Sequence, residues 1–179
     1  MKVFIGGSSR DVESIYYENI DKLALYLSKA NYNLLIGCDC GLVGYVQDLF
    51  SKYKSKVSIM EALPYKKDNY KCEVYCYDTI CERKSNLINN ANLIVFLPGG
   101  IGTLDEIFTA IESKRAKEYD VPIVIININN YYDELISLLD KIYREKFADL
   151  DNKQLYYIAC DVDDAIKYIE KLGDKVENK

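Results

Sequence analysis

Short apolar runs alternate along the chain with longer stretches in which apolar residues recur at helical spacing. Five runs are rich in Val and Ile and lack strict apolar–polar alternation, so they predict strands that are covered on both faces. These runs are KVFIG at 2–6, NLLIG at 33–37, KVSIM at 56–60, NLIVFLP at 92–98 and VPIVIIN at 121–127. Strands separated by helices in this way predict a mostly parallel sheet with right-handed crossovers.

The stretches between the strands predict helices, because their apolar residues fall on one helical face. Ile20, Leu23 and Leu27 show this spacing in the first stretch. The least periodic segment, residues 63–77, predicts a loop that leads into a short strand. The expected helices are Val12–Ala30, Gly41–Lys54, Asp78–Asn90, Thr103–Lys117, Tyr131–Phe147 and Val162–Leu172. The fold class that follows is α/β: a Rossmann-like, doubly wound, mostly parallel sheet with helices on both faces, in a single domain over 1–179.

Composition and charge narrow the classes of partner. A chain of 179 residues with 49% hydrophobic and 28% charged residues is ordinary for a globular protein. Its net charge of -5 gives no electrostatic reason to expect a nucleic acid as a partner. The first apolar stretch stops at Gly6, which is too short for a signal-peptide core or a membrane span. We therefore expect a cytoplasmic protein that binds neither nucleic acid nor membrane.

The chain contains no histidine, and this absence removes several reaction mechanisms at once. Ser-His-Asp and Cys-His nucleophiles and His-ligated metals are excluded, so acid–base chemistry falls to carboxylates, Lys, Tyr, Cys or groups of the substrate. Among the six cysteines, Cys38-x-Cys40 and Cys72-x3-Cys76 lack a typical zinc spacing. Reduced thiols are the expectation for a cytosolic chain. Neither a metal nor a cofactor is expected.

Three glycine-containing turns follow predicted strands, at 6–9, 37–44 and 98–103. In open parallel sheets, ligands bind beyond the carboxyl ends of the strands, where the winding direction switches. The third turn, PGGIGT, precedes a helix, so its amide N–H groups and the helix dipole favour an anion such as a phosphate. The expected phosphate-binding residues of the first and third turns are Gly7, Ser8, Gly99, Gly100, Gly102 and Thr103.

The third turn matches neither of two common phosphate motifs. No Lys-Ser/Thr pair follows its glycines, as a Walker A loop requires, and Asp105 stands where the last glycine of GxGxxG would be. Glu106 also has a purely structural interpretation, because Thr103 and Glu106 have the spacing of a capping box. Spacing alone favours that cap, and the charged string at 82–84 alone indicates a solvated helix face.

The string ERKSNLINNANLIVFLPGGIGTLDE at 82–106 resembles the paired signature of the LOG (Lonely Guy) family, in which an Arg-Lys pair precedes PGGxGTxxE. The resemblance extends to VFIGGSS at 3–9, GLVG at 41–44 and VPIVIININNYYDEL at 121–135, and so covers most of the chain. Members of this family are nucleoside 5'-monophosphate phosphoribohydrolases that activate cytokinins, and they are often mislabelled as lysine decarboxylases.

The resemblance implies a role for each residue of the signature. The glycine turn would hold the 5'-phosphate of a nucleotide such as AMP, and Glu106 would stabilise an oxocarbenium-like centre or orient water. Arg83 would polarise the leaving base or hold the ribose and phosphate, while Lys84 would add charge near the phosphate. The family also implies a homodimer or larger oligomer, for which Leu87 and Ile88 are candidates unless they belong to the core.

Some positions depart from the family pattern. Three consecutive glycines are usual in the second turn, but this chain has Gly37, Cys38 and Asp39, and the Asp39 charge would repel a phosphate. Ile101, Ile80 and Thr109 replace an aromatic residue, a Met and a Glu. A non-catalytic carrier of the same fold, similar to the molybdenum-cofactor carriers, is the alternative function. A pyridoxal-phosphate lysine decarboxylase is discounted, because nothing places a Schiff-base lysine in a phosphate pocket.

Overall fold

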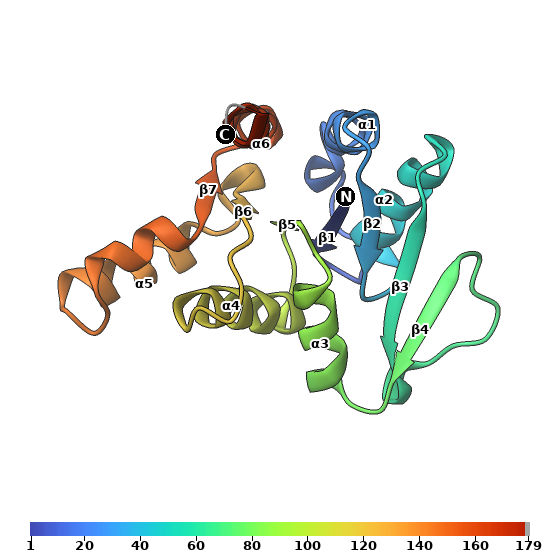
Figure 1. Cartoon of the computed structure of the whole chain (residues 1–179), viewed down its shortest axis with the longest axis horizontal. Coiled ribbons are helices and arrows are strands. Elements are labelled where there is room, and N and C mark those ends of the chain that lie inside the picture. The colour runs from blue at the N-terminus through green and yellow to red at the C-terminus, as the bar shows by residue number, and fades with distance from the viewer. Residues whose placement is uncertain (178–179) are drawn as a thin grey trace.

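The computed structural model describes residues 1–177 and the side chains of residues 1–173. Within that range, seven parallel strands form one sheet in the order β4-β3-β2-β1-β5-β6-β7, with helices on both faces (Figure 1). This architecture confirms the expected α/β fold class. The strands are β1 Lys2–Gly6, β2 Asn33–Ile36, β3 Val57–Ala62, β4 Glu73–Tyr77, β5 Leu93–Phe96, β6 Ile123–Ile126 and β7 Tyr157–Ala159.

Within the described residues, five helices connect successive strands, and α6 follows the last strand, β7. The helices are α1 Ile20–Lys29, α2 Gly41–Lys52, α3 Ile80–Asn89, α4 Ile101–Arg115, α5 Asp133–Arg144 and α6 Val162–Glu177. Short 3-10 helices also occur at η1 Ser14–Tyr17, η2 Leu63–Tyr65, η3 Ile128–Asn130 and η4 Leu150–Leu155. No helix within residues 1–177 has both the length and the apolar character that crossing a membrane requires.

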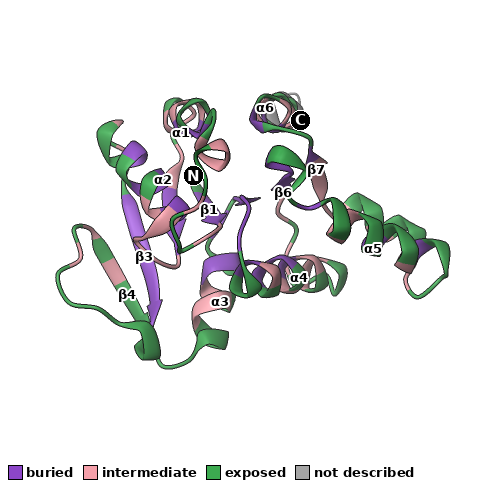
Figure 2. Cartoon of the chain, turned by 180° about the vertical axis from the view of Figure 1, so that it is seen from behind, coloured by how far each residue is buried: buried purple, intermediate pink, exposed green. Residues whose placement is uncertain are grey.

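Alternate residues of the central strands pack into two separate cores. In β5, Leu93 and Val95 lie in the core that α1, α2 and α6 cover, whereas Ile94 and Phe96 lie under α3, α4 and α5. Figure 2 shows β3 buried along its length, beside the mostly exposed edge strand β4. Because both faces of the sheet are covered, the strand sequences need no polar face and lack apolar–polar alternation.

The winding direction of the chain switches between β1 and β5. From β1 the chain runs through β2 and β3 to β4 at one edge, then returns to β5 and continues to β6 and β7. Gly6 of β1 pairs with Phe96 of β5, so the turns that follow these strands are neighbours. The Ser8 N–H donates to the Pro98 carbonyl at 3.0 Å. The first and third glycine turns therefore meet at the switch point, where such sheets bind ligands.

Several boundaries differ from the sequence-based expectation. The helix expected over Val12–Ala30 is divided into η1 and α1, because Asn19 between them has a left-handed backbone with φ of 61°. α4 begins at Ile101, two residues before the expected start, because Gly100 is the last residue with an extended backbone and serves as the N-cap. α5 is shorter than Tyr131–Phe147, and α6 runs beyond Leu172.

The two edge strands were expected to different degrees. The short strand predicted for the segment at 63–77 is β4, which forms the end of that segment and pairs in parallel with β3. β7 was not predicted, because it has only three residues at the other edge of the sheet and two of them are half-buried. A strand this short leaves too few positions for an apolar pattern to stand out.

Candidate functional site

The first and third glycine turns are joined by a side-chain hydrogen bond. The Thr103 hydroxyl donates to the Gly7 carbonyl at 3.1 Å, although these residues are 96 positions apart. A Cβ atom at Gly99 would lie 2.1 Å from Thr103 Oγ1, so only glycine fits there. The Ser8 hydroxyl bonds to the backbone of Arg10 at 3.0 Å, which holds the first turn closed. The structure thus brings Gly7, Ser8, Gly99 and Thr103 together.

Gly100 and Gly102 leave the start of α4 open. A Cβ atom at either position would meet nothing within 4 Å. Gly100 is the N-cap residue of α4, and no side chain caps the helix. Because the first N–H groups of a helix have no intrahelical acceptor, the α4 start presents free donors and a positive dipole end. This arrangement suits an oxyanion such as a phosphate.

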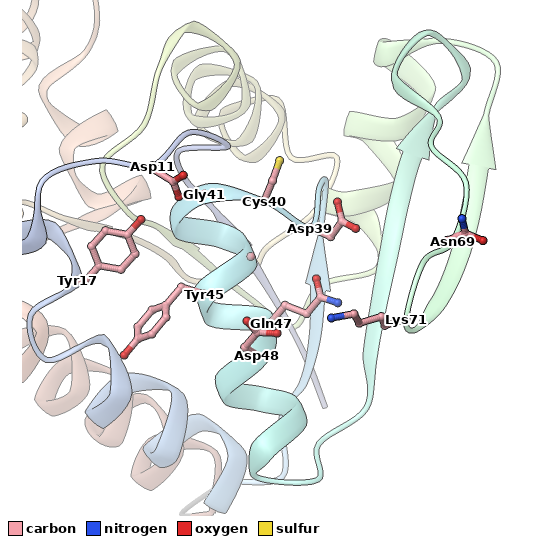
Figure 3. Close-up of a pocket in the computed structure, with 11 residues that line it drawn as sticks. Asp11, Tyr17, Asp39, Cys40, Gly41, Tyr45, Gln47, Asp48, Asn69 and Lys71 are labelled. Carbon is pink, nitrogen blue, oxygen red and sulfur yellow. The ribbon is translucent and has the colours of Figure 1, made fainter.

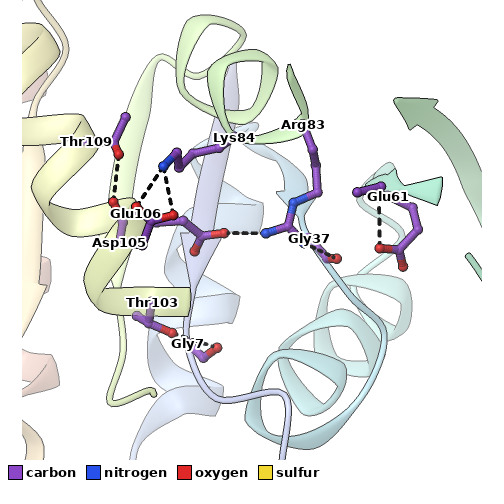
Figure 4. A network of polar contacts seen from close by, with 10 residues as sticks. Gly7, Gly37, Glu61, Arg83, Lys84, Thr103, Asp105, Glu106 and Thr109 are labelled. Atoms are coloured by element: carbon purple, nitrogen blue, oxygen red, sulfur yellow. Dashed lines mark hydrogen bonds and ion pairs between the residues drawn. The ribbon is translucent and has the colours of Figure 1, made fainter. Parts of the chain in front are cut away.

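A buried ion pair joins α3 to α4 near these turns (Figure 4). Arg83 Nη2 donates to Glu106 Oε1 at 3.0 Å, and the two side chains are only 13% and 9% exposed. Arg83 Nη1 donates to the Gly37 carbonyl at 3.3 Å. Glycine at 6 and at 37 makes room for the pair, since added Cβ atoms would lie 3.1 Å from Glu106 Oε2 and 3.2 Å from Arg83 Nη1.

Burial raises the pKa of the acid in this pair. Desolvation raises the pKa of Glu106 to about 7, although the positive charge of Arg83 opposes the rise and the negative charge of Asp105 adds to it. Glu106 therefore changes its charge near neutral pH. Arg83 Nε is buried and has no hydrogen-bond partner among the described residues. An unused donor on a buried arginine beside a carboxylate with a raised pKa is typical of a functional site.

The capping-box interpretation of Glu106 is wrong. Because α4 begins at Ile101, Thr103 lies inside the first turn, and its hydroxyl bonds to Gly7 rather than to a helix N–H. The Glu106 side chain extends to Arg83. The interpretation of Arg83 as part of a solvated helix face is also wrong, because its guanidinium group is buried.

A second ion pair runs beside the buried one. Lys84 Nζ contacts both carboxylate oxygens of Asp105 at 2.7 Å. The Lys84 side chain is 13% exposed, but Asp105 is 50% exposed, so water screens this pair more than the first. Asp105 thus holds the ammonium group that is expected near the phosphate.

The second turn departs from the family pattern, and the carboxylate that it adds, Asp39, has an ion-pair partner. Asp39 accepts from Lys67 Nζ at 2.9 Å, which offsets the repulsion expected for a phosphate. Burial is the main reason that the pKa of the Cys38 thiol rises to about 12, so this cysteine stays protonated at neutral pH. Lys67 lies in the loop between β3 and β4, and no sequence pattern indicated that it would reach the second turn.

Sequence analysis missed Glu61, which lies at the carboxyl end of β3. Its side chain is 2% exposed and accepts from the Ala62 N–H and the Tyr70 hydroxyl, both at 3.1 Å. Burial raises the pKa of Glu61, while the charges of Arg83 and Lys67 oppose the rise. The available signal was a single acidic residue at the end of a strand whose only other polar residue is Ser58.

The remaining residues of the signature support the turns or the core. Tyr131 and Tyr132 donate hydroxyl bonds to the Gly99 and Leu97 carbonyls at 2.7 and 2.8 Å, and so support the third turn from the segment between β6 and α5. Leu87 and Ile88 lie in the core, at 0% and 2% exposed, and are therefore not available to a partner. No three His, Cys, Asp or Glu side chains within residues 1–173 gather closely enough to hold a metal ion.

Comparison with known proteins identifies the family to which the chain belongs. The model of the family described as "Possible lysine decarboxylase" matches residues 49–169, which is more than half of the chain. Cytokinin riboside 5'-monophosphate phosphoribohydrolase LOG4 of Arabidopsis thaliana is 28% identical over 99 residues, or 55% of this chain. That alignment spans 46% of LOG4, so less than half of the relative is covered. LOG1 of the same species is 25% identical over 173 residues, covering 94% of this chain and 81% of LOG1.

A solved structure of a molybdenum cofactor carrier protein has the same fold. The molybdenum cofactor carrier protein of Chlamydomonas reinhardtii superposes with a TM-score of 0.71 over 96% of each chain, at 16% identity. At that identity the likeness shows the fold alone. The family match, the LOG relatives and the signature at 82–106 agree with one another. The chain therefore belongs to the LOG family, whose model is described as possible lysine decarboxylase.

Proposed function

We propose that the protein hydrolyses the N-glycosidic bond of a nucleoside 5'-monophosphate, AMP or a cytokinin riboside monophosphate, to the free base and ribose 5-phosphate. The observation that carries this proposal is the buried Arg83–Glu106 pair next to an uncapped helix start. The names of the relatives, which are cytokinin riboside 5'-monophosphate phosphoribohydrolases, support the same reaction. Neither a metal nor a cofactor enters the proposal.

The phosphate would bind at the start of α4. The free N–H groups of the first turn donate to its oxygens, and the glycines at 100 and 102 allow the backbone to approach it. Gly7, Gly99 and Thr103 would fix the shape of this site through the hydrogen bond between the two turns. Lys84 would add positive charge, in competition with its ion pair to Asp105.

The chemistry would take place at Glu106. Cleavage of the N-glycosidic bond builds positive charge at the anomeric carbon, which an ionised carboxylate stabilises. The same carboxylate can orient the attacking water and accept its proton. Arg83 keeps a free Nε–H donor for the leaving base or a ribose hydroxyl, and its charge favours the ionised form of Glu106.

The direct test is product analysis. The full chain is incubated with AMP, GMP, CMP and UMP, and with adenosine as a control that lacks the phosphate. We expect at least one monophosphate to yield free base and ribose 5-phosphate in equal amounts, while adenosine reacts at least about a hundredfold more slowly, because phosphate binding energy supports the reaction. The absence of base release from every monophosphate would contradict the proposal.

A carrier function is the second candidate. The observation that favours it is the second turn, where Asp39 and its partner Lys67 occupy space that glycines leave open in the family pattern. The Chlamydomonas reinhardtii protein with the same fold is a molybdenum cofactor carrier protein by name. Tight retention of a pterin-type cofactor by the purified chain, together with no turnover of any monophosphate, would select this function.

We also propose that the protein forms a homodimer or a larger homo-oligomer, as the family resemblance implies. Leu87 and Ile88 no longer support this proposal, because they lie in the core. Ile80, Ile101 and Phe108 of α3 and α4 are exposed apolar side chains, at 38%, 83% and 43%. Light scattering at micromolar concentration tests the proposal, and a monomeric mass would refute it.

A further inference from the structure

A groove of about 380 Å³ lies along the amino-terminal half of α2 (Figure 3). Its walls come from the segment after β1, from η1, from α2 and from the loop before β4. Neither Arg83, Glu106 nor any residue of the third turn lines it. The second turn does line it, through Asp39, Cys40, Gly41 and Gly44, so the groove borders that turn but excludes the Arg83–Glu106 pair and the α4 start. Because the proposed hydrolysis rests on that pair and that helix start, an inference about the groove does not depend on it.

The groove carries an excess of negative charge. Three aspartates, Asp11, Asp39 and Asp48, line it together with one basic residue, Lys71. Asp39 is paired with Lys67 outside the lining. The side-chain carboxylates of Asp11 and Asp48 have neither a hydrogen bond nor an ion pair within residues 1–173. Two carboxylates without partners on one groove favour a positively charged ligand.

A buried amide in the same wall points to a ligand independently of the charges. Gln47 lines the groove and is 7% exposed. Its Nε2 contacts Cys72 Sγ at 3.8 Å, while its Oε1 has no hydrogen-bond partner among the described residues. A buried acceptor without a donor destabilises the fold, so each such group calls for an explanation. A ligand N–H that reaches Gln47 Oε1 would supply the missing donor.

The spacing of the acids decides between a metal ion and an organic cation. No three acidic or cysteine side chains within residues 1–173 are close enough to hold one metal ion. Carboxylates that share a groove but not a coordination sphere fit a cation whose charges are spread along a chain. Tyr17 and Tyr45, in edge-to-face contact at 5.2 Å, add aromatic surface for methylene groups and for an ammonium ion.

We propose that this groove binds a linear di- or polyamine. One ammonium group lies between Asp48 and the Gln47 amide, a second lies toward Asp11, and the methylene chain packs on the tyrosine pair. Figure 3 shows the Lys71 side chain directed toward Gln47 and Asp48. The Lys71 ammonium group therefore competes for the place of the first ligand ammonium, and the ligand displaces it on binding.

Calorimetry with spermidine and the full chain tests this proposal at 0.15 M ionic strength, where long-range attraction is screened. We expect saturable binding that Asp48→Asn weakens about fivefold or more, because one charge pair is lost. Gln47→Met, which changes no charge, should weaken it about fivefold by removing the acceptor. Lys71→Gln should tighten it, because the competing ammonium group is gone.

The matched control is Asp21→Asn, which removes the same charge from the exposed face of α1 outside the groove. We expect this variant to bind spermidine as the wild type does. Gln47→Met should melt no lower than the wild type, because it removes an unpaired buried oxygen, so lost binding cannot be attributed to unfolding. Three results would overturn the proposal: no saturable binding, equal affinities in the Gln47→Met, Asp48→Asn and Asp21→Asn variants, or displacement of spermidine by equimolar Mg²⁺.

Discussion

The same four-residue pattern, Thr-x-x-Glu, occurs at the start of α3 and at the start of α4, but its side chains make different contacts in the two helices. In α3, Thr79 and Glu82 form a capping box: Thr79 Oγ1 accepts from the Glu82 N–H at 3.1 Å, and Glu82 Oε2 accepts from the Thr79 N–H at 3.3 Å. In α4, Thr103 bonds to Gly7 and Glu106 pairs with Arg83.

The difference comes from where each helix begins. α3 starts at Ile80, one residue after Thr79, so the threonine occupies the cap position. α4 starts at Ile101 because the turn before it contains glycines, and this moves Thr103 into the helix. The side chains at 103 and 106 are then free to contact other elements. A motif that stabilises a helix in one place thus contributes to a candidate catalytic site in the other.

The largest expected effect follows from removing the buried cation of the α4 site. Arg83→Met leaves Glu106 buried without a counter-charge, which typically costs about 3 kcal/mol of unfolding free energy when the acid is ionised. Loss of the arginine also raises the pKa of Glu106 above its value of about 7, because the positive charge that lowers this pKa is removed. We expect the loss in chemical denaturation to be large at pH 8.5 and much smaller at pH 5, where Glu106 is neutral. Equal losses at both pH values would contradict an ionised pair.

A linked expectation concerns the pH dependence of stability. Burial raises the pKa of Glu106 from 4.5 to about 7, so the folded state binds this proton more tightly than the unfolded state does. The stabilising contribution of the protonated acid is complete below about 4.5 and is lost as the pH rises to about 7. Relative to Glu106→Gln, the wild type should therefore lose stability over this interval, as thermal melts at several pH values will measure.

Turnover should follow the opposite course. If ionised Glu106 performs the chemistry, kcat/KM should fall about tenfold for each pH unit below about 7 and stay level above it. Assays of ribose 5-phosphate release between pH 5 and pH 8.5 measure this profile. A profile that is flat across pH 7 would show that another group, or none, controls the rate.

The glycine that begins α4 gives a smaller effect, confined to binding. Gly100 has φ of -87° and open space around its Cα, so Gly100→Val should fold normally while its side chain projects toward the phosphate. We expect AMP affinity to fall at least about tenfold in calorimetry, since one or more amide contacts to the phosphate are lost. Unchanged affinity would place the phosphate elsewhere.

The smallest effect belongs to the α3 capping box. Thr79→Ala should lower the unfolding free energy by about 1 kcal/mol, because one cap hydrogen bond is lost. Turnover should remain at the wild-type level, because among the described residues the Thr79 side chain bonds only to Glu82. Its one bond to Arg83 runs from the Arg83 N–H to the Thr79 backbone carbonyl at 3.1 Å, and alanine keeps that carbonyl. Denaturant titration and product release on one preparation check both statements. A large fall in turnover would mean that the two helix starts are not independent.

The layers of the fold were predictable from the sequence, because two-sided burial leaves long apolar runs. The strand β7 and the break between η1 and α1 were not, since a three-residue strand and one left-handed Asn19 leave no periodic signal. Within the site, the glycine turns were predictable from local chemistry. The partner of Glu106 was not, because Arg83 is 23 positions away and only the resemblance linked the two. Lys67 was missed for the same reason, because it contacts Asp39 across 28 positions. Glu61 carried only the weak signal of one acidic residue at a strand end.

Turnover by Glu106→Gln is the most direct test of the claim that the α4 pattern is chemical rather than structural. A neutral amide keeps the shape of the side chain but cannot stabilise a positive anomeric centre or accept a proton from water. With AMP affinity and melting temperature measured on the same sample, we expect base release to fall at least about a hundredfold while nucleotide binding persists. Wild-type turnover in this variant would contradict the account and leave Glu106, like Glu82, a structural residue.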